Sequence, residues 1–179
     1  MRELSLNVLD VAQNSIVAEA SLIEIDVTQS RAADRLTIVI ADNGRGMSAE
    51  QAQSALDPFY TTRTTRDIGM GIPLFKMAAE MAGGSFLLHS EQGVGTQVTA
   101  VFQLSHIDCV PLGDMAGTVE TLIRLNASLD FVFRYVTDDG EGVLDTRELR
   151  EQLEDVPLNE PDVMLWIREC LAEMTTDSI

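Results

Sequence analysis

Three glycine clusters stand where the backbone could approach a ligand closely. The segment GMGIP, residues 69–73, lies between a threonine-rich stretch and a helix-forming run, so its free amides would face whatever that stretch covers. Unpaired amides at a helix N-terminus attract anions, and a phosphate group is the natural ligand there. The segments DNGRGM, residues 42–47, and GVGT, residues 93–96, border apolar runs, and each taken alone fits an ordinary turn.

A further candidate is the segment DVAQNS, residues 10–15, in an otherwise largely apolar helix-forming run. Asp10 and Asn14 are four residues apart, and Glu3 and Asn7 continue the same helical face. Taken alone, this polar stripe favours a simple interpretation, the solvent-facing side of an amphipathic helix. A chemical role for it depends on the rest of the chain.

The elements that must position these residues follow from the periodicity of apolar side chains. In chain order the pattern predicts a helix over 2–20, strands over 21–30 and 34–44, a short helix capped by Ser48, a loop over 57–73, a helix over 74–84, and strands over 85–91 and 96–104. Four strands backed by helices predict an α+β fold, a two-layer α/β sandwich with a largely antiparallel sheet.

The residues after about Ser105 change character. Helices are expected over 112–127, 146–153 and 160–174, with a hairpin formed by 129–136 and 142–145. We therefore divide the chain into a first domain, residues 1–104, and a small α+β extension, residues 105–179. The segment TDDGEGVLDTRE, residues 137–148, partly matches a calcium loop, but Thr137 replaces the first acidic ligand and a strand-forming run precedes it. A hairpin turn is favoured.

The composition excludes several classes of partner. Twelve basic against 29 acidic residues give a net charge of -17, which would repel nucleic acids and anionic membrane surfaces. No apolar run reaches the length of a membrane span, and Asn7 and Asp10 interrupt any signal-peptide core, so we expect a cytoplasmic protein. Cys109 and Cys170 have no His or Cys at metal-ligand spacing, so no zinc site is expected.

In order along the chain, the polar pair and the glycine clusters resemble the ATP-binding domain of the GHKL superfamily. That superfamily holds gyrase, heat-shock chaperone ATPases, mismatch-repair ATPases and histidine kinases. The series is Asp10 and Asn14, Asp42-x-Gly44-x-Gly46, DPFYTTR, Gly69-x-Gly71 and Gly93-x-Gly95-Thr96. The match covers residues 3 to about 103 and looks closest to the kinase branch. It implies a Bergerat-type fold, a mostly antiparallel mixed sheet with helices on one face, that binds ATP and Mg²⁺.

The resemblance also assigns roles to single residues. It implies that Asn14 holds Mg²⁺, that Asp42 accepts a hydrogen bond from the adenine amino group, and that Thr96 places a hydroxyl near the adenine. Gly44 and Gly46 let the backbone pass under the nucleotide. The other implied nucleotide contacts are Met47, Thr62, Met70 and Ile72, together with Gly69 and Gly71, which hinge a lid and offer amides to the phosphates.

Three charged positions decide what such a site could do with ATP. Arg63 and Arg66 are the only cations of the lid and are candidate γ-phosphate contacts. Asp10 takes the position that is glutamate in ATPases that activate water and often asparagine in histidine kinases. Aspartate can act as a base but is one methylene shorter, so a catalytic base and a structural orienter both stay open. Val17 departs from the basic residue common in histidine kinases.

Phosphoryl transfer to a partner protein is the first functional expectation. The first helix begins at the N-terminus, so no dimerisation helix pair is expected before the domain, and stand-alone domains of this type include the serine kinases that act as anti-sigma factors. The alternatives are an ATP-gated protein-binding module without transfer and a slow ATPase that uses Asp10. The oligomeric state stays open. His106 and Asp108 echo a histidine kinase phosphoacceptor box on the wrong side of the domain, and a chance match is favoured.

Overall fold

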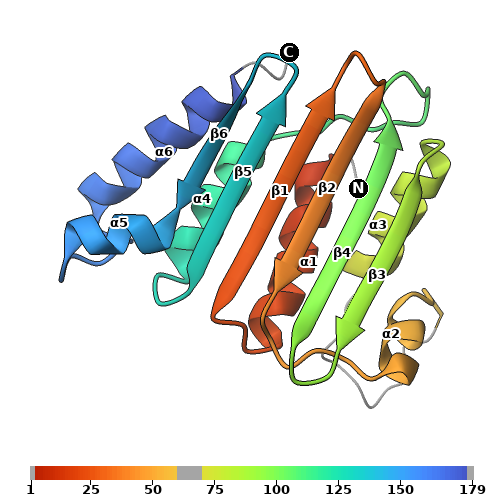
Figure 1. Ribbon diagram of the computed structural model, residues 1–179, viewed down its shortest axis with the longest axis horizontal. Helices are drawn as coiled ribbons and strands as arrows, with labels where there is room; N and C mark the ends of the chain where they lie inside the picture. Colours follow the sequence, from red (N-terminus) through yellow and green to blue (C-terminus); the bar gives the residue numbers. More distant parts are fainter. Residues whose placement is uncertain (1–2, 60–69, 177–179) are drawn as a thin grey trace.

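A six-stranded sheet forms the centre of the molecule, with α1, α3 and α4 packed behind it in the view of Figure 1. The computed structural model describes residues 3–59 and 70–176. The strands are β1 (Leu22–Ser30), β2 (Arg35–Asp42), β3 (Ser85–Glu91), β4 (Gly95–Gln103), β5 (Asp130–Thr137) and β6 (Gly140–Asp145). The helices are α1 (Leu4–Val17), α2 (Ala49–Ala55), α3 (Gly71–Met81), α4 (Met115–Leu125), α5 (Thr146–Leu153) and α6 (Pro161–Thr175).

The strand order is β3-β4-β2-β1-β5-β6. Neighbouring strands are antiparallel except β1 and β5, which run parallel with Leu22 beside Asp130. The predicted α+β fold with a mostly antiparallel mixed sheet is therefore confirmed. The sheet continues without a break across the boundary expected near Ser105, because β5 and β6 extend the edge formed by β1. The division into domains 1–104 and 105–179 stays a prediction.

The core lies between the sheet and the helices. Alternate side chains of a strand point to opposite faces, so one face of each central strand can be apolar throughout. In β1 the side chains of Ile23, Ile25 and Val27 are buried, whereas Glu24 between them is exposed. β5 repeats the pattern with three buried aromatic residues, Phe131, Phe133 and Tyr135. The extension thus contributes to the same apolar layer as the first four strands.

The polar stripe of α1 is solvated only in part. Asn7 is only 2% exposed, and of the four stripe residues only Asp10 is classed as exposed. The chain before α4 also runs past the start of α1. There the Leu4 and Ser5 amides donate to the carbonyls of Pro111 and Leu112 at 3.0 and 2.8 Å. The simple expectation of a solvent-facing side is therefore wrong for Asn7, whereas Glu3 and Asn14 are partly exposed.

Two local predictions about helix starts can be compared directly with the structure. Ser48 caps α2 through a capping box, in which its side chain accepts from the Gln51 amide and the Gln51 side chain accepts from the Ser48 amide. This cap confirms the predicted start of the short helix. α3 begins at Gly71, three residues before the expected Leu74, because a proline such as Pro73 is tolerated in the first turn of a helix.

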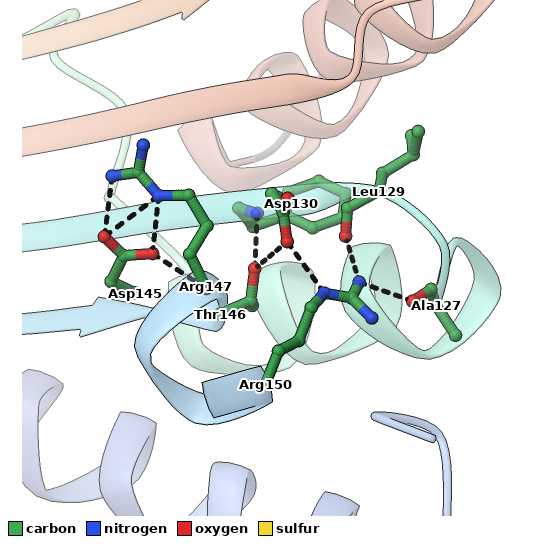
Figure 2. A network of polar contacts seen from close by, with 8 residues as sticks. Ala127, Leu129, Asp130, Asp145, Thr146, Arg147 and Arg150 are labelled. Atoms are coloured by element: carbon green, nitrogen blue, oxygen red, sulfur yellow. Dashed lines mark hydrogen bonds and ion pairs between the residues drawn. The ribbon is translucent and has the colours of Figure 1, made fainter. Parts of the chain in front are cut away.

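A polar network fixes α5 against the turn between α4 and β5 (Figure 2). The Arg150 guanidinium donates to Asp130 Oδ1 at 2.8 Å and to the carbonyls of Ala127 and Leu129 at 2.6 and 2.8 Å. The buried Thr146 hydroxyl accepts from the Phe131 amide at 2.8 Å. Because α5 follows β6 directly, this network holds the start of α5 in a fixed position on the sheet.

Candidate functional site

A cavity of about 280 Å³ opens between α1, the ends of β2 and β4, and the loop after β2. Its volume is close to the lower end of the range of small-molecule sites, about 300–1,000 Å³. Its walls combine apolar side chains with a few polar groups: Val11, Asn14, Ser15, Val17, Ala18, Ile40, Asp42, Arg45, Gly46, Met47, Gln51, Ile72, Thr96 and Val98. Such a lining suits a flat apolar ring system that also carries hydrogen-bonding groups.

The Asp42 carboxylate, at the end of β2, is held by two hydrogen bonds. The Ser15 hydroxyl donates to Oδ2 at 2.6 Å, and the Gly44 amide donates to Oδ1 at 2.9 Å. Within the described ranges 3–59 and 70–176, no ion pair joins Asp42 to a cation. Each carboxylate oxygen has a second lone pair, so Asp42 keeps acceptor capacity for a ligand in the cavity.

The loop after β2 is tied to the β3–β4 hairpin. Gly46 has a φ of +65°, and a Cβ built there would lie 1.9 Å from the carbonyl oxygen of Glu91, so only glycine fits. Ser90 Oγ accepts from the Met47 amide at 2.8 Å and lies 2.7 Å from Thr96 Oγ1. The hairpin and the loop therefore fix Met47 and Thr96 together in the cavity wall.

Asn14 contributes an amide side chain to the cavity. Its Nδ2 is buried and has no hydrogen-bond partner among the residues that the structure describes. A buried donor without a partner costs free energy, so this side chain is suited to a bound ligand that completes its hydrogen bonding. In the described part of the chain, no group of three or more His, Cys, Asp or Glu side chains could hold a metal ion. A Mg²⁺ ion here would take the Asn14 amide oxygen as a protein ligand, a donor type it accepts, beside phosphate and water oxygens.

Asp10 lies outside the cavity, at the contact between α1 and α3. It is exposed, and a Cβ on Gly71 would come within 2.8 Å of the Asp10 Cβ. The N-terminus of α3 has no side-chain cap, and its second residue, Ile72, lines the cavity. Asp10 is therefore a neighbour of the α3 N-terminus, where a negative charge is favourable.

The predicted site residues fall into three groups. The cavity is lined by Asn14, Asp42, Gly46, Met47, Ile72 and Thr96. Four others are described but do not line it: Asp10, Gly44, Met70 and Gly71. The predictions for Thr62, Arg63, Arg66 and Gly69 lie outside the described residues. The first two groups show that motifs separated by more than 80 residues meet at one end of the sheet.

Sequence reasoning missed three supporting residues. Ser15 and Ser90 position Asp42, Met47 and Thr96 as described above, and Asn43 accepts hydrogen bonds from the Ser21 and Leu22 amides, both at 2.9 Å. Ser15 directly follows Asn14 in the first polar segment, and that adjacency was a usable signal. Asn43 lies inside the segment DNGRGM, which was also a usable signal, whereas nothing in the local sequence distinguishes Ser90 from an ordinary surface residue.

His106 lies far from this cavity. Thr96 lines the cavity near one end of β4, and Gln103, three residues before His106, is at the other end. The usual rise of a strand separates Thr96 from Gln103 by about 23 Å. His106 Nδ1 accepts from the Asp108 amide at 3.1 Å. The imidazole therefore cannot reach a phosphate bound in the cavity of its own chain.

Across the described residues, no helix is both long and apolar enough to cross a membrane.

Comparisons with known proteins agree with this geometry. A family model described as histidine kinase-, DNA gyrase B-, and HSP90-like ATPase matches residues 1–106. The heme sensor protein HssS of Staphylococcus saprophyticus is 32% identical over 80 residues, which are 44% of this chain and 17% of that protein. The sensor histidine kinase ZraS of Escherichia coli K12 is 29% identical over 91 residues, 51% of this chain and 19% of that protein. The chain thus spans less than a fifth of either relative.

Two solved structures show the same fold. The Aquifex aeolicus MutL ATPase domain complexed with ADP has a TM-score of 0.52 at 12% identity, covering 94% of this chain and 88% of that one. The N-terminal domain of a DNA repair protein has a TM-score of 0.55 at 19% identity, covering 81% of this chain and 53% of that one. The first of these similarities extends over nearly the whole length of the present chain.

Proposed function

The chain belongs to the histidine kinase-, DNA gyrase B-, and HSP90-like ATPase family, and from this premise we propose that it binds Mg·ATP in the cavity and phosphorylates a partner protein. The strongest support is the Asp42 carboxylate, which two hydrogen bonds hold in the cavity wall while no described cation pairs with it. A carboxylate held in this way is a directed acceptor for an exocyclic amino group such as that of adenine.

Placing the adenine ring against Asp42 also assigns roles to the other residues of the cavity. Thr96 and Met47 flank the adenine, and Asn14 faces the phosphate end with its unpartnered amide. The uncapped N-terminus of α3 offers the amides of Gly71 and Ile72 to phosphate oxygens. Bound Mg²⁺ supplies neutralisation of the phosphate charge, and Asn14 gives it an oxygen. Arg63, Arg66, Thr62 and Gly69 stay in the proposal as candidate phosphate contacts and lid residues.

Transfer to a partner is favoured over hydrolysis by the position of Asp10. Its side chain is exposed and does not line the cavity, and it stands beside the N-terminus of α3. There it supports α3 as a positioning residue without activating water. In the transfer, a hydroxyl or imidazole of the partner forms a bond to the γ-phosphorus and loses its proton to water. The bond from the γ-phosphorus to the bridging oxygen breaks, and ADP leaves with that bonding electron pair. The sensor histidine kinases among the relatives point in the same direction.

Nucleotide binding is tested by titration of ATP, with and without Mg²⁺, followed by calorimetry. We expect Asn14→Ala to weaken Mg·ATP binding about 10-fold or more and to remove most of the effect of Mg²⁺, because one metal ligand is lost. Asn159→Ala is the matched control, since Asn159 is an exposed amide on a loop in the extension. Full affinity and unchanged Mg²⁺ dependence in Asn14→Ala would exclude the proposed metal position.

Transfer is tested by incubating the protein and its co-purified partners with ATP labelled on the γ-phosphate. Label on a partner that is lost with Asn14→Ala supports the kinase. ATP hydrolysis without any labelled protein, abolished by Asp10→Asn, would instead establish the slow ATPase. If ATP binds and changes partner affinity but is neither transferred nor hydrolysed, the protein is a nucleotide-gated binding module.

A further inference from the structure

The outer side of the extension carries a second hollow, an apolar groove between α5 and α6. It measures about 290 Å³ and is lined by Leu149, Gln152, Leu153, Asp162, Val163 and Trp166. Trp166, the single tryptophan of the chain, is 48% exposed at this groove. A large aromatic side chain left half in solvent beside other apolar groups is the usual anchor of a protein contact.

Both walls of the groove are fixed. α5 is held through Arg150 and Thr146 by the network of Figure 2. α6 is held from its inner side by the fully buried Ile167 and Leu171. Arg168 of α6 also donates two hydrogen bonds to the Glu120 carboxylate of α4, at 2.7 and 2.9 Å. The groove is therefore preformed, which lowers the entropic cost of binding.

The groove carries a negative charge, and the arginines of α5 and α6 are already paired with other carboxylates. Arg147 pairs with Asp145 at 2.7 Å, and Arg150 and Arg168 pair with Asp130 and Glu120. Asp162 lines the groove, and neither it nor Glu169 and Glu173 further along α6 has an ion pair within the described ranges. On α6 the helical spacing places Asp162, Glu169 and Glu173 on the same face as Trp166. An apolar floor is thus bordered by uncompensated carboxylates.

We propose that this groove docks a basic amphipathic helix of a partner protein. Such a helix places apolar side chains at i, i+3, i+4 and i+7 in a groove while its lysines and arginines meet the acidic border. An anionic membrane or a nucleic acid would be repelled by the same carboxylates. The site is separate from the nucleotide cavity and does not require ATP, so it goes beyond the proposed kinase function.

The test uses Trp166 as a built-in reporter. The full chain, without nucleotide, is titrated with a synthetic peptide of about 18 residues that has leucines at those helical positions and lysines elsewhere. Burial of the indole predicts a shift of the fluorescence emission to shorter wavelength with a saturating binding curve. A peptide with the same lysines and serines in place of the leucines should bind at least about 10-fold more weakly, because the groove then has nothing apolar to bury.

Two variants separate docking from general attraction between a basic peptide and an acidic protein. Val163→Asp makes the protein more negative yet should weaken binding about 10-fold or more, since it puts a carboxylate in the apolar floor. Gln152→Lys, at an exposed position on the groove, should weaken binding about 3-fold to 10-fold. Gln97→Lys is its matched control, because Gln97 is equally exposed on β4, away from the groove, and should leave affinity unchanged.

Several outcomes would overturn the proposal. One is equal weakening by Gln152→Lys and Gln97→Lys, which would mean attraction by net charge alone. Another is a chain that self-associates through this face, shown by ultracentrifugation as a dimer that Val163→Asp converts to monomer. Binding to phosphatidylserine vesicles with the same emission shift would assign the groove to a membrane surface. Loss of ATP binding in the cavity variants bears only on the nucleotide site, so the two proposals fail independently.

Discussion

Two aspartates lie on either side of the start of β1 and have different kinds of hydrogen-bond partner. Asp42 pairs in register with Ile23 on one side, and Asp130 pairs with Leu22 on the other. Asp42 is held only by a hydroxyl and an amide and borders a cavity. Asp130 accepts from the Arg150 guanidinium and the Thr146 hydroxyl. The difference separates a ligand site from a structural contact. The Asp42 carboxylate has no described cationic partner and is open to a ligand, whereas the Asp130 carboxylate is paired with an arginine of α5.

Removing the charge of Asp42 should therefore affect ligand binding and leave the fold intact. Asp42→Asn is expected to weaken ATP binding about 10-fold to 100-fold, because a charge-assisted hydrogen bond to the adenine amino group is replaced by an amide. Thermal unfolding without nucleotide should change little. Calorimetric titration measures the first effect, with Asp139→Asn, in an exposed turn, as the control. A large loss of stability at unchanged affinity would place Asp42 with Asp130 as a structural residue.

Removing the partner of Asp130 should have the reverse effect. Arg150→Ala leaves two carbonyls without the guanidinium donor and the Asp130 carboxylate with only the Thr146 hydroxyl, and it is expected to lower the free energy of unfolding by about 2 kcal/mol. Urea denaturation measures it, and ATP affinity should stay the same. Arg147→Ala removes a more exposed guanidinium that bonds only to the Asp145 carboxylate, and it should cost less. An equal loss of unfolding free energy in Arg150→Ala and Arg147→Ala would show that the hydrogen bonds of Arg150 stabilise the fold no more than the pair of Arg147 does.

The pairing of Glu120 should make α6 sensitive to acid. Hydrogen bonds from the Arg168 guanidinium, with the charge of Arg124 nearby, hold the pKa of Glu120 below its ordinary value of 4.5. A carboxyl whose pKa is lowered by folding stabilises the fold fully above that ordinary value and loses the contribution as the pH falls below it. Glu120→Gln is expected to cost about 1 kcal/mol near neutral pH. The difference from wild type should shrink in urea titrations as the pH falls below 4.5, and a difference that stays constant over that fall would contradict this origin.

The smallest expected effect concerns the support of Asp42. Ser15→Ala removes the hydroxyl that donates to Asp42 Oδ2, so ATP affinity should fall about 2-fold to 5-fold through looser positioning. Ser54→Ala is a matched control, because its hydroxyl donates to the Glu50 carbonyl on an exposed helix away from Asp42. Unchanged ATP affinity in Ser15→Ala would show that the Gly44 amide alone orients the carboxylate.

The local elements were predictable because their signals are local. Ser48 and Asp145 cap their helices in the structure as their residue types indicate, and the alternation of apolar residues from Phe131 to Tyr135 identifies a strand. The parallel pairing of β1 with β5 could not be predicted, because alternation specifies a buried face and leaves the neighbouring strand open. The same limit applies to the start of α1, whose first amides donate to a segment that lies about 100 residues further along the chain.

The candidate site was predictable where residue types are restrictive. Asn14, Asp42, Gly46 and Thr96 belong to separated motifs whose order resembles a known superfamily, and the structure brings all four to one cavity. Ser15 and Ser90 were missed because serine is common and its role depends on which carboxylate or amide the fold brings near it. The roles of these two serines can be seen only from the contacts that they make in the folded chain.

The parallel pairing of β1 and β5 also sets an order of events while the protein is being synthesised. The last residue of β1 is Ser30, whereas β5 is complete only at Thr137. At about 5–20 residues per second, β1 is finished roughly 5 to 20 seconds before its outer neighbour exists. Through that interval its outer edge carries unpaired amides and carbonyls, which are open to pairing with strands of other chains. β1 thus waits for a neighbour that begins 100 residues after β1 has ended, since β1 ends at Ser30 and β5 begins at Asp130.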